Sequence, residues 1–112
     1  MKIATWNVNS INIRMEVMLN WLAETQTDVV CLQETKTVDE NFPEAACKEA
    51  GYNVAFMGQK SYNGVAIISR YPVDDVQKNF MDDEDESPKR MISAMVNGVR
   101  IVNTYIPNGT EL

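Results

Sequence analysis

The spacing of apolar and polar residues in the first half of the chain predicts strands that alternate with helices. Residues Lys2–Val8 mix β-branched and aromatic side chains, which is typical of a strand. Apolar residues then recur at helical spacing and predict a helix over Asn12–Thr25, and the apolar run Asp28–Gln33 predicts a buried strand. The segment Phe42–Gly51, with an early proline and a final glycine, predicts a short helix.

The second half of the chain predicts strands without a further helix. Asn97 and Gly98 separate two β-rich runs and form a strong hairpin signal. Residues Tyr71–Pro88, which include an acidic run, predict an exposed loop. The strands are predicted over Tyr52–Met57, Gly64–Arg70, Arg90–Val96 and Val99–Ile106. The predicted fold class is therefore α/β, with a mixed β-sheet and helices on one face.

A sheet with helices on only one face needs another layer over its other face. The sequence shows no internal repeat and no second domain. We therefore expect residues 1–112 to be a portion of a single larger domain, or half of an assembly that self-associates through the uncovered sheet face.

Charge and composition narrow the classes of partner. The net charge is −6, which is the wrong sign for holding nucleic acid by bulk electrostatics, although a local basic groove or a metal-bridged anionic substrate stays open. No apolar run reaches the roughly 20 residues that span a membrane, and no signal-peptide pattern is present, so we expect a cytoplasmic protein without a membrane partner. Cys31 and Cys47 are expected to be reduced, buried thiols.

The chain contains no histidine. This removes the commonest general base and the commonest transition-metal ligand. Catalysis by serine–histidine, cysteine–histidine or zinc–histidine groups therefore cannot be completed within these residues. A metal site built from this sequence must use oxygen ligands, which favours magnesium, manganese or calcium.

Polar side chains follow three of the predicted strands where each strand ends. Asn7 follows the first, Glu34 the second, and Asn103 to Tyr105 the last. Because the first two strands are expected to be parallel, Asn7 and Glu34 should lie at the same sheet edge, where ligands bind in open α/β sheets. An amide oxygen and a carboxylate suit a hard divalent cation beside a phosphoester. The alternatives are a turn-capping Asn7, a solvated Glu34 loosely paired with Lys36, and a half-buried aromatic at Tyr105.

Five segments together resemble a known family. The segments "WNVNSI", "LQETK", "GYNVAF", "YNGVAIISR" and "NTYIPNG" are ordered and spaced as in the N-terminal part of exodeoxyribonuclease III and related apurinic/apyrimidinic endonucleases. These enzymes belong to the endonuclease/exonuclease/phosphatase superfamily. The resemblance covers nearly the whole chain and implies a four-layered α/β sandwich. It implies that this chain supplies about half of that sandwich, namely the first sheet and its helices, with the partner sheet absent.

The resemblance also implies roles for individual residues. Glu34 matches the metal-ligand glutamate, Asn7 the asparagine beside the metal and the scissile phosphate, and Lys36 a lysine that supports this cluster. Asn9 falls where some relatives carry an aspartate, so it would be a weaker ligand. Tyr105 matches a tyrosine that stabilises charge on the phosphate. Further substrate or DNA contacts are implied for Asn108, Arg90, Lys60, Tyr62 and Asn63.

The function implied is Mg²⁺-dependent phosphodiester hydrolysis in DNA repair, with Mn²⁺ as a substitute ion. The substrates would be double-stranded DNA with abasic sites or 3′ ends. The family's later Asp-x-Asn and Asp-His motifs cannot be placed in this sequence, so we expect the 112-residue chain to be inactive alone. The alternatives are a non-catalytic interaction or dimerisation module, and a superfamily phosphatase that acts on a small phosphoester.

Overall fold

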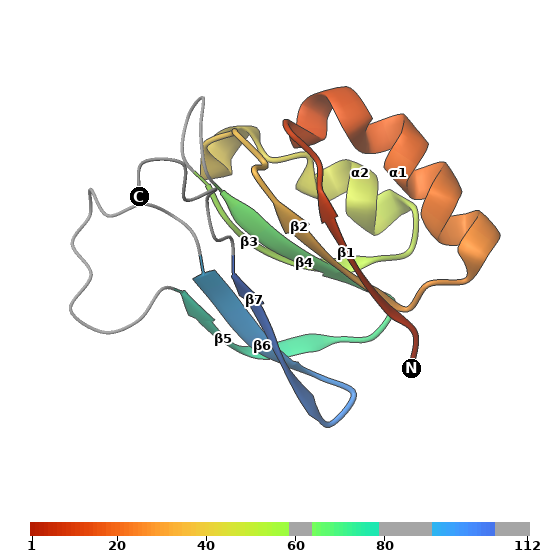
Figure 1. Cartoon of the computed structure of the whole chain (residues 1–112), viewed down its shortest axis with the longest axis vertical. Coiled ribbons are helices and arrows are strands. Elements are labelled where there is room, and N and C mark those ends of the chain that lie inside the picture. Colours follow the sequence, from red (N-terminus) through yellow and green to blue (C-terminus); the bar gives the residue numbers. More distant parts are fainter. Residues whose placement is uncertain (59–63, 79–90, 105–112) are drawn as a thin grey trace, which may run out of the picture.

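The computed structural model describes residues 1–58, 64–78 and 91–104, which form seven strands, two α-helices and a short 3-10 turn at Asp39–Asn41 (Figure 1). The elements are β1 (Ile3–Asn7), α1 (Ile11–Thr25), β2 (Val29–Gln33), α2 (Glu44–Glu49), β3 (Asn53–Met57), β4 (Val65–Ser69), β5 (Val73–Lys78), β6 (Met91–Val96) and β7 (Val99–Thr104). The two predicted helices and the six predicted strands are confirmed, with boundary differences of a few residues.

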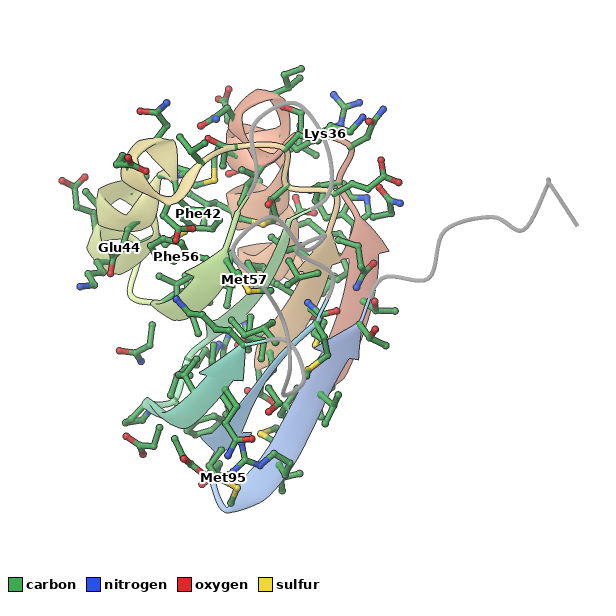
Figure 2. All side chains as sticks on the ribbon, turned by 90° about the vertical axis from the view of Figure 1, so that its left-hand side faces the viewer. Lys36, Phe42, Glu44, Phe56, Met57 and Met95 are labelled. Carbon is green, nitrogen blue, oxygen red and sulfur yellow. The ribbon has the colours of Figure 1, made fainter. Side chains whose placement is uncertain are left out.

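Sheet A contains four strands in the order β1-β2-β4-β3, and both helices lie on one of its faces (Figure 1). Strands β1 and β2 are parallel, as expected, and β4 is antiparallel to both of its neighbours. Met18 and Leu22 of α1 are fully buried against Val30 and Leu32 of β2. The short helix α2 is held to β3 by the stacked rings of Phe42 and Phe56, whose centroids lie 4.2 Å apart (Figure 2). Helices on one face of an α/β sheet are therefore confirmed.

Sheet B contains β5, β6 and β7 in an antiparallel arrangement and packs on the other face of sheet A. Its inward residues Ile92, Ala94 and Val96 are fully buried with Val29 and Ile67 of sheet A. The strands thus form two sheets and not one, and the expectation that the partner sheet is absent is wrong. The physical reason is that every residue of β4 is buried, so this strand needs a layer on each face.

The segment after β4 explains why one strand was missed. Residues 73–78 were expected to lie in an exposed loop, but they form β5, which pairs with β6 across a register irregularity. Most of its side chains are exposed, so the strand lacks the alternation that signals burial. The hairpin prediction is confirmed: Asn97 and Gly98 both have positive φ and join β6 to β7.

The two cysteines are buried and free, in agreement with the sequence analysis. Cys31 lies between the two sheets, and Cys47 lies on the buried face of α2. Burial raises the pKa of each thiol to about 11, with a smaller contribution from Glu44 at Cys47. Within the part of the chain that the structure describes, no helix is long and apolar enough to cross a membrane.

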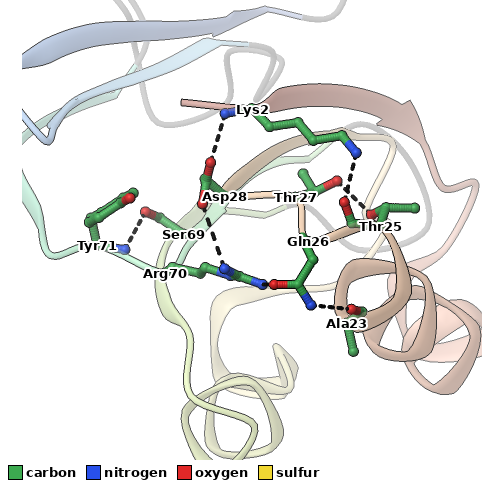
Figure 3. A network of polar contacts seen from close by, with 9 residues as sticks. All are labelled: Lys2, Ala23, Thr25, Gln26, Thr27, Asp28, Ser69, Arg70 and Tyr71. Carbon is green, nitrogen blue, oxygen red and sulfur yellow. Dashed lines mark hydrogen bonds and ion pairs between the residues drawn. The ribbon is translucent and has the colours of Figure 1, made fainter.

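A polar network fixes the register of the strands at the end where β1 and β2 begin (Figure 3). The backbone N–H of Lys2 donates to Asp28 Oδ2 at 2.7 Å, and Arg70 Nη1 lies 3.8 Å from Asp28 Oδ1. Arg70 also donates to Gln26 Oε1 at 3.1 Å. These contacts tie the start of β1 and β2 to the end of β4. At the opposite end of the same strands, Asn7 is the register partner of Gln33.

Candidate metal and phosphate site

Asn7 and Glu34 meet at the carboxyl ends of β1 and β2. The parallel register pairs Asn7 with Gln33, so Glu34 comes directly after the paired position. Asn7 Nδ2 donates to Glu34 Oε2 at 2.6 Å. The Glu34 side chain is 21% exposed, which leaves it accessible to a ligand from solvent. The expected proximity of these two residues is therefore observed.

Lys36 and Asn9 close a ring of contacts around this pair. Lys36 Nζ lies 3.5 Å from Glu34 Oε1 and donates to Asn9 Oδ1 at 2.5 Å. The backbone N–H of Asn9 donates to Asn7 Oδ1 at 3.1 Å. Figure 2 shows Lys36 at the end of the molecule opposite Met95. The four residues that the sequence placed at a metal centre are thus connected in a closed series of contacts, and we call Asn7, Asn9, Glu34 and Lys36 the polar ring.

The backbone that carries the polar ring is unusual. Asn9, Ser10, Glu34 and Lys36 all have positive φ, between 49° and 93°. Non-glycine residues rarely adopt this region, and each costs about 1 kcal/mol or more. The two loops are held together by backbone hydrogen bonds from Ser10 to Glu34 (2.8 Å) and from Ile11 to Thr35 (3.0 Å). Left-handed residues concentrated in two adjoining loops are typical of a site whose side-chain directions matter more than local stability.

A second polar cluster lies next to the ring and connects the two sheets. The Asn103 side chain of β7 is 2% exposed and donates to the carbonyl oxygens of Leu32 and Ala66, both at 2.8 Å. Gln33 Nε2 donates to Asn103 Oδ1 and to Thr5 Oγ1, both at 2.8 Å. The same nitrogen also donates to the carbonyl oxygen of Cys31 at 3.2 Å. The sequence analysis named Asn103 at a polar strand end but assigned it no role. Asn103 lies two positions after Ile101, on the same inward face of β7, and an amide at that alternating position is the signal that could have identified it.

Thr35, which lies between Glu34 and Lys36 of the polar ring, is in close contact with Gly64. Thr35 is 1% exposed, its backbone N–H donates to Gly64 O at 3.2 Å, and its Oγ1 has no hydrogen-bond partner among the described residues. Gly64 has φ +93°, and a Cβ built there would lie 2.1 Å from Thr35 Oγ1. Only glycine fits at this position, which explains the glycine immediately before β4.

The remaining residues that the sequence assigned to the site lie outside the described residues. These are Tyr105, Asn108, Arg90, Lys60, Tyr62 and Asn63. Their predicted contacts with phosphate or DNA stay predictions. Asp39 Oδ1 accepts a hydrogen bond from the backbone N–H of Gly58 at 2.8 Å, which connects the 3-10 turn Asp39–Asn41 to the end of β3.

The atoms of the polar ring that could bind a metal ion are all oxygens. They comprise the Glu34 carboxylate and the amide oxygens of Asn7 and Asn9. The described residues contain no group of three or more His, Cys, Asp or Glu side chains that could enclose a metal ion. A single carboxylate with amide oxygens fits Mg²⁺, which keeps several waters and is shared with substrate phosphates. The same set does not fit a structural zinc ion.

Comparison with known proteins identifies the family of the chain. Residues 4–110 match the Endonuclease/Exonuclease/phosphatase family. Exodeoxyribonuclease III of Haemophilus influenzae is 31% identical over 97% of this chain. The match covers 42% of that protein, so the chain spans about two fifths of the relative's length.

Solved structures show the same fold. A 3′ phosphatase from Neisseria, bound to a product DNA hairpin, is 45% identical with a TM-score of 0.89 and covers 94% of this chain and 41% of its own. An AP endonuclease from Archaeoglobus fulgidus is 44% identical with a TM-score of 0.88, over 96% and 42% of the two chains. The resemblance inferred from the five motifs is confirmed. That the chain is the N-terminal portion of one such domain stays a prediction.

Proposed function

Because the chain belongs to the endonuclease/exonuclease/phosphatase family, we propose that it forms part of a Mg²⁺-dependent DNA-repair nuclease. The reaction would be hydrolysis of phosphodiester bonds at abasic sites or 3′ ends of double-stranded DNA. The observation that carries this proposal is the direct contact between Asn7 and Glu34 at the carboxyl ends of two parallel strands. The relatives named exodeoxyribonuclease III and AP endonuclease support the same reaction class.

Each member of the ring has a distinct role in this proposal. Glu34 and Asn7 would hold Mg²⁺, or Mn²⁺ in its place, and the bound ion would supply positive charge to a phosphate oxygen. Lys36 pairs with Glu34 at 3.5 Å and fixes Asn9 through a hydrogen bond. Asn9 in turn orients Asn7 through its backbone N–H. Tyr105 is proposed to contact the phosphate.

Recognition of DNA is assigned to residues outside the ring. Asn108, Arg90, Lys60, Tyr62 and Asn63 are the proposed contacts with the substrate. A net charge of −6 favours contacts made locally and through the metal over contacts made by a general basic surface. The chain has no histidine, so we propose that it is inactive alone and that other residues complete the site.

A second candidate is the removal of 3′ phosphates from DNA. It is favoured by the 45% identity with the Neisseria 3′ phosphatase. Both reactions need a metal-bound phosphate at a DNA end, so the polar ring serves either one. Self-association has less support, because sheet B already covers much of the face that was expected to be open. It would have to use other apolar surface, such as that near Ile3 and Val17, which are exposed.

Activity assays on the full-length gene product distinguish these candidates. The wild type should cleave an abasic-site duplex in Mg²⁺, and Glu34→Gln should lower kcat/KM by about 100-fold or more, because the substitution removes the only carboxylate of the ring. A duplex with a 3′ phosphate tests the second candidate in the same assay. Activity that is unchanged in Glu34→Gln, or cleavage of the abasic duplex by the purified 112-residue chain, would contradict the proposal.

A further inference from the structure

We propose that Asn103 and Gln33 are positioning residues that hold Asn7 and Glu34 in contact across the end of the sheet. The inference deepens the proposed function, since it assumes that this pair binds the metal ion. It rests on the second polar cluster, formed by Asn103, Gln33 and Thr5. None of these side chains needs to touch the substrate in this role.

Asn103 connects the two sheets close to the polar ring, since Leu32, one of its partners, lies two residues before Glu34. Leu32 and Ala66 are paired across β2 and β4, and both of their carbonyl oxygens accept from Asn103 Nδ2. A buried amide with three hydrogen bonds has one allowed orientation, because any rotation would leave a buried polar group unsatisfied. Asn103 therefore sets where the end of β7 lies relative to the end of β2.

Gln33 passes this constraint to the polar ring. Its side chain donates to Asn103 on one side and to Thr5 of β1 on the other. Its backbone is equally engaged, since Val8 N–H donates to Gln33 O at 3.0 Å. Gln33 is the register partner of Asn7 and the chain neighbour of Glu34. Fixing Gln33 thus restricts both partners of the 2.6 Å hydrogen bond.

The geometry also explains why the ring needs such support. Glu34 and Asn9 lie in loops with positive φ, so local backbone preference does not favour their orientation. Groups behind a metal ligand commonly fix its direction, and their loss lowers metal affinity by about 10- to 100-fold. We assign this orienting role to Asn103 and Gln33, with Glu34 and Asn7 as the ligands that they orient.

The test compares Asn103→Leu with Ile101→Val in the 112-residue chain. Asn103→Leu preserves the approximate volume and removes the hydrogen bonds between the sheets. Ile101 lies two residues earlier on β7 and is buried between the same sheets, so Ile101→Val loosens packing without changing a hydrogen bond. Gln33→Met is the second variant, because it disconnects the ring while leaving the bonds from Asn103 to Leu32 and Ala66. It serves if Asn103→Leu does not fold.

Two NMR readouts are recorded for each folded variant. The first is the chemical shift of the Asn7 side-chain amide without metal, which reports the hydrogen bond to Glu34. The second is the dissociation constant for Mg²⁺ from shifts at residues 7 and 34. We expect Asn103→Leu and Gln33→Met to change the Asn7 signal and to weaken Mg²⁺ binding about tenfold, whereas Ile101→Val should leave both near wild type.

The outcomes separate this inference from the proposed function. If the wild type does not bind Mg²⁺ at Asn7 and Glu34, the metal assignment fails, and the Asn7 signal in metal-free protein still tests the positioning role. If the Asn7 signal in Asn103→Leu and Gln33→Met is no different from that in Ile101→Val, the positioning role is wrong. The same conclusion follows if the wild type binds Mg²⁺ and all variants bind it equally well.

Discussion

The contact between Gly64 and Thr35 gives a quantitative prediction for one added methyl group. In Gly64→Ala, the new Cβ would lie 2.1 Å from Thr35 Oγ1 and 3.3 Å from the backbone nitrogen of Lys36. An alanine at positive φ costs about 1–2 kcal/mol. Overpacking a buried site costs a further ~1–3 kcal/mol. We therefore expect the free energy of unfolding to fall by about 2–5 kcal/mol in total.

Gly98→Ala is the matched control for this substitution. Gly98 also has positive φ (+81°), but a Cβ there meets nothing within 4 Å. Its cost should therefore be limited to the backbone contribution, about 1–2 kcal/mol. The difference between the two alanine variants isolates the steric clash with Thr35.

Thr35 itself provides the compensating change. Its Oγ1 is buried without a hydrogen-bond partner among the described residues, so Thr35→Ala removes no side-chain hydrogen bond within them. In the Gly64→Ala background it removes the atom that clashes, and it should restore about 1–3 kcal/mol of stability. The double variant should be more stable than Gly64→Ala alone, although Thr35→Ala in the wild type is neutral or destabilising.

Urea denaturation followed by tryptophan fluorescence measures these values. Trp6 of β1 and Trp21 of α1 lie with ring centroids 6.2 Å apart, so their emission reports the packing of the helix on sheet A. A Gly64→Ala variant that is no less stable than Gly98→Ala would refute the steric argument. So would a double variant in which Thr35→Ala gives no recovery.

Three further predictions follow from the described contacts. The free energy of unfolding should fall as pH rises from about 9 to about 11, because the unfolded thiols ionise near 9.0 while the folded-state pKa values of Cys31 and Cys47 are about 11. In denaturation experiments, Cys31→Val should reduce this dependence of stability on pH. An unchanged dependence in Cys31→Val would contradict the prediction. Asp28→Ala should lower stability by about 1 kcal/mol and leave Mg²⁺ binding at the polar ring intact, as checked by denaturation and titration. Lys36→Met should change stability by less than about 1 kcal/mol but shift the Asn9 side-chain amide signal in NMR spectra, since its ion pair is partly exposed; an unshifted signal would argue against the contact.

Parts of this fold were accessible from sequence pattern because they depend on local periodicity. The helix α1 and strand β2 follow from apolar spacing, and the β6–β7 hairpin follows from Asn97-Gly98. Strand β5 was missed because its side chains are mostly exposed. The division into two sheets was missed because it depends on which strands pair, and a one-dimensional pattern does not contain that information.

The candidate site could also be predicted in part from the sequence. The proximity of Asn7 and Glu34 was predicted because parallel strands end at the same edge of a sheet, and the two side chains are in contact in the structure. The positive φ values of Glu34 and Lys36 were not foreseen, since neither residue type favours that conformation. The role of Asn103 depends on an approach between two sheets, across 71 residues of sequence to Leu32, which no local pattern reports.

Mg²⁺ titration of the 112-residue chain, with Glu34→Gln measured in parallel, tests the central claim most directly. In two-dimensional NMR spectra, the wild type should show saturable shifts centred on Asn7, Asn9 and Glu34, and Glu34→Gln should abolish them. The acidic run at residues 82–86 offers a competing place for weak cation binding, so the location of the shifts decides the result. Shifts confined to that run and unchanged in Glu34→Gln would contradict the assignment of Asn7 and Glu34 as the metal-binding pair.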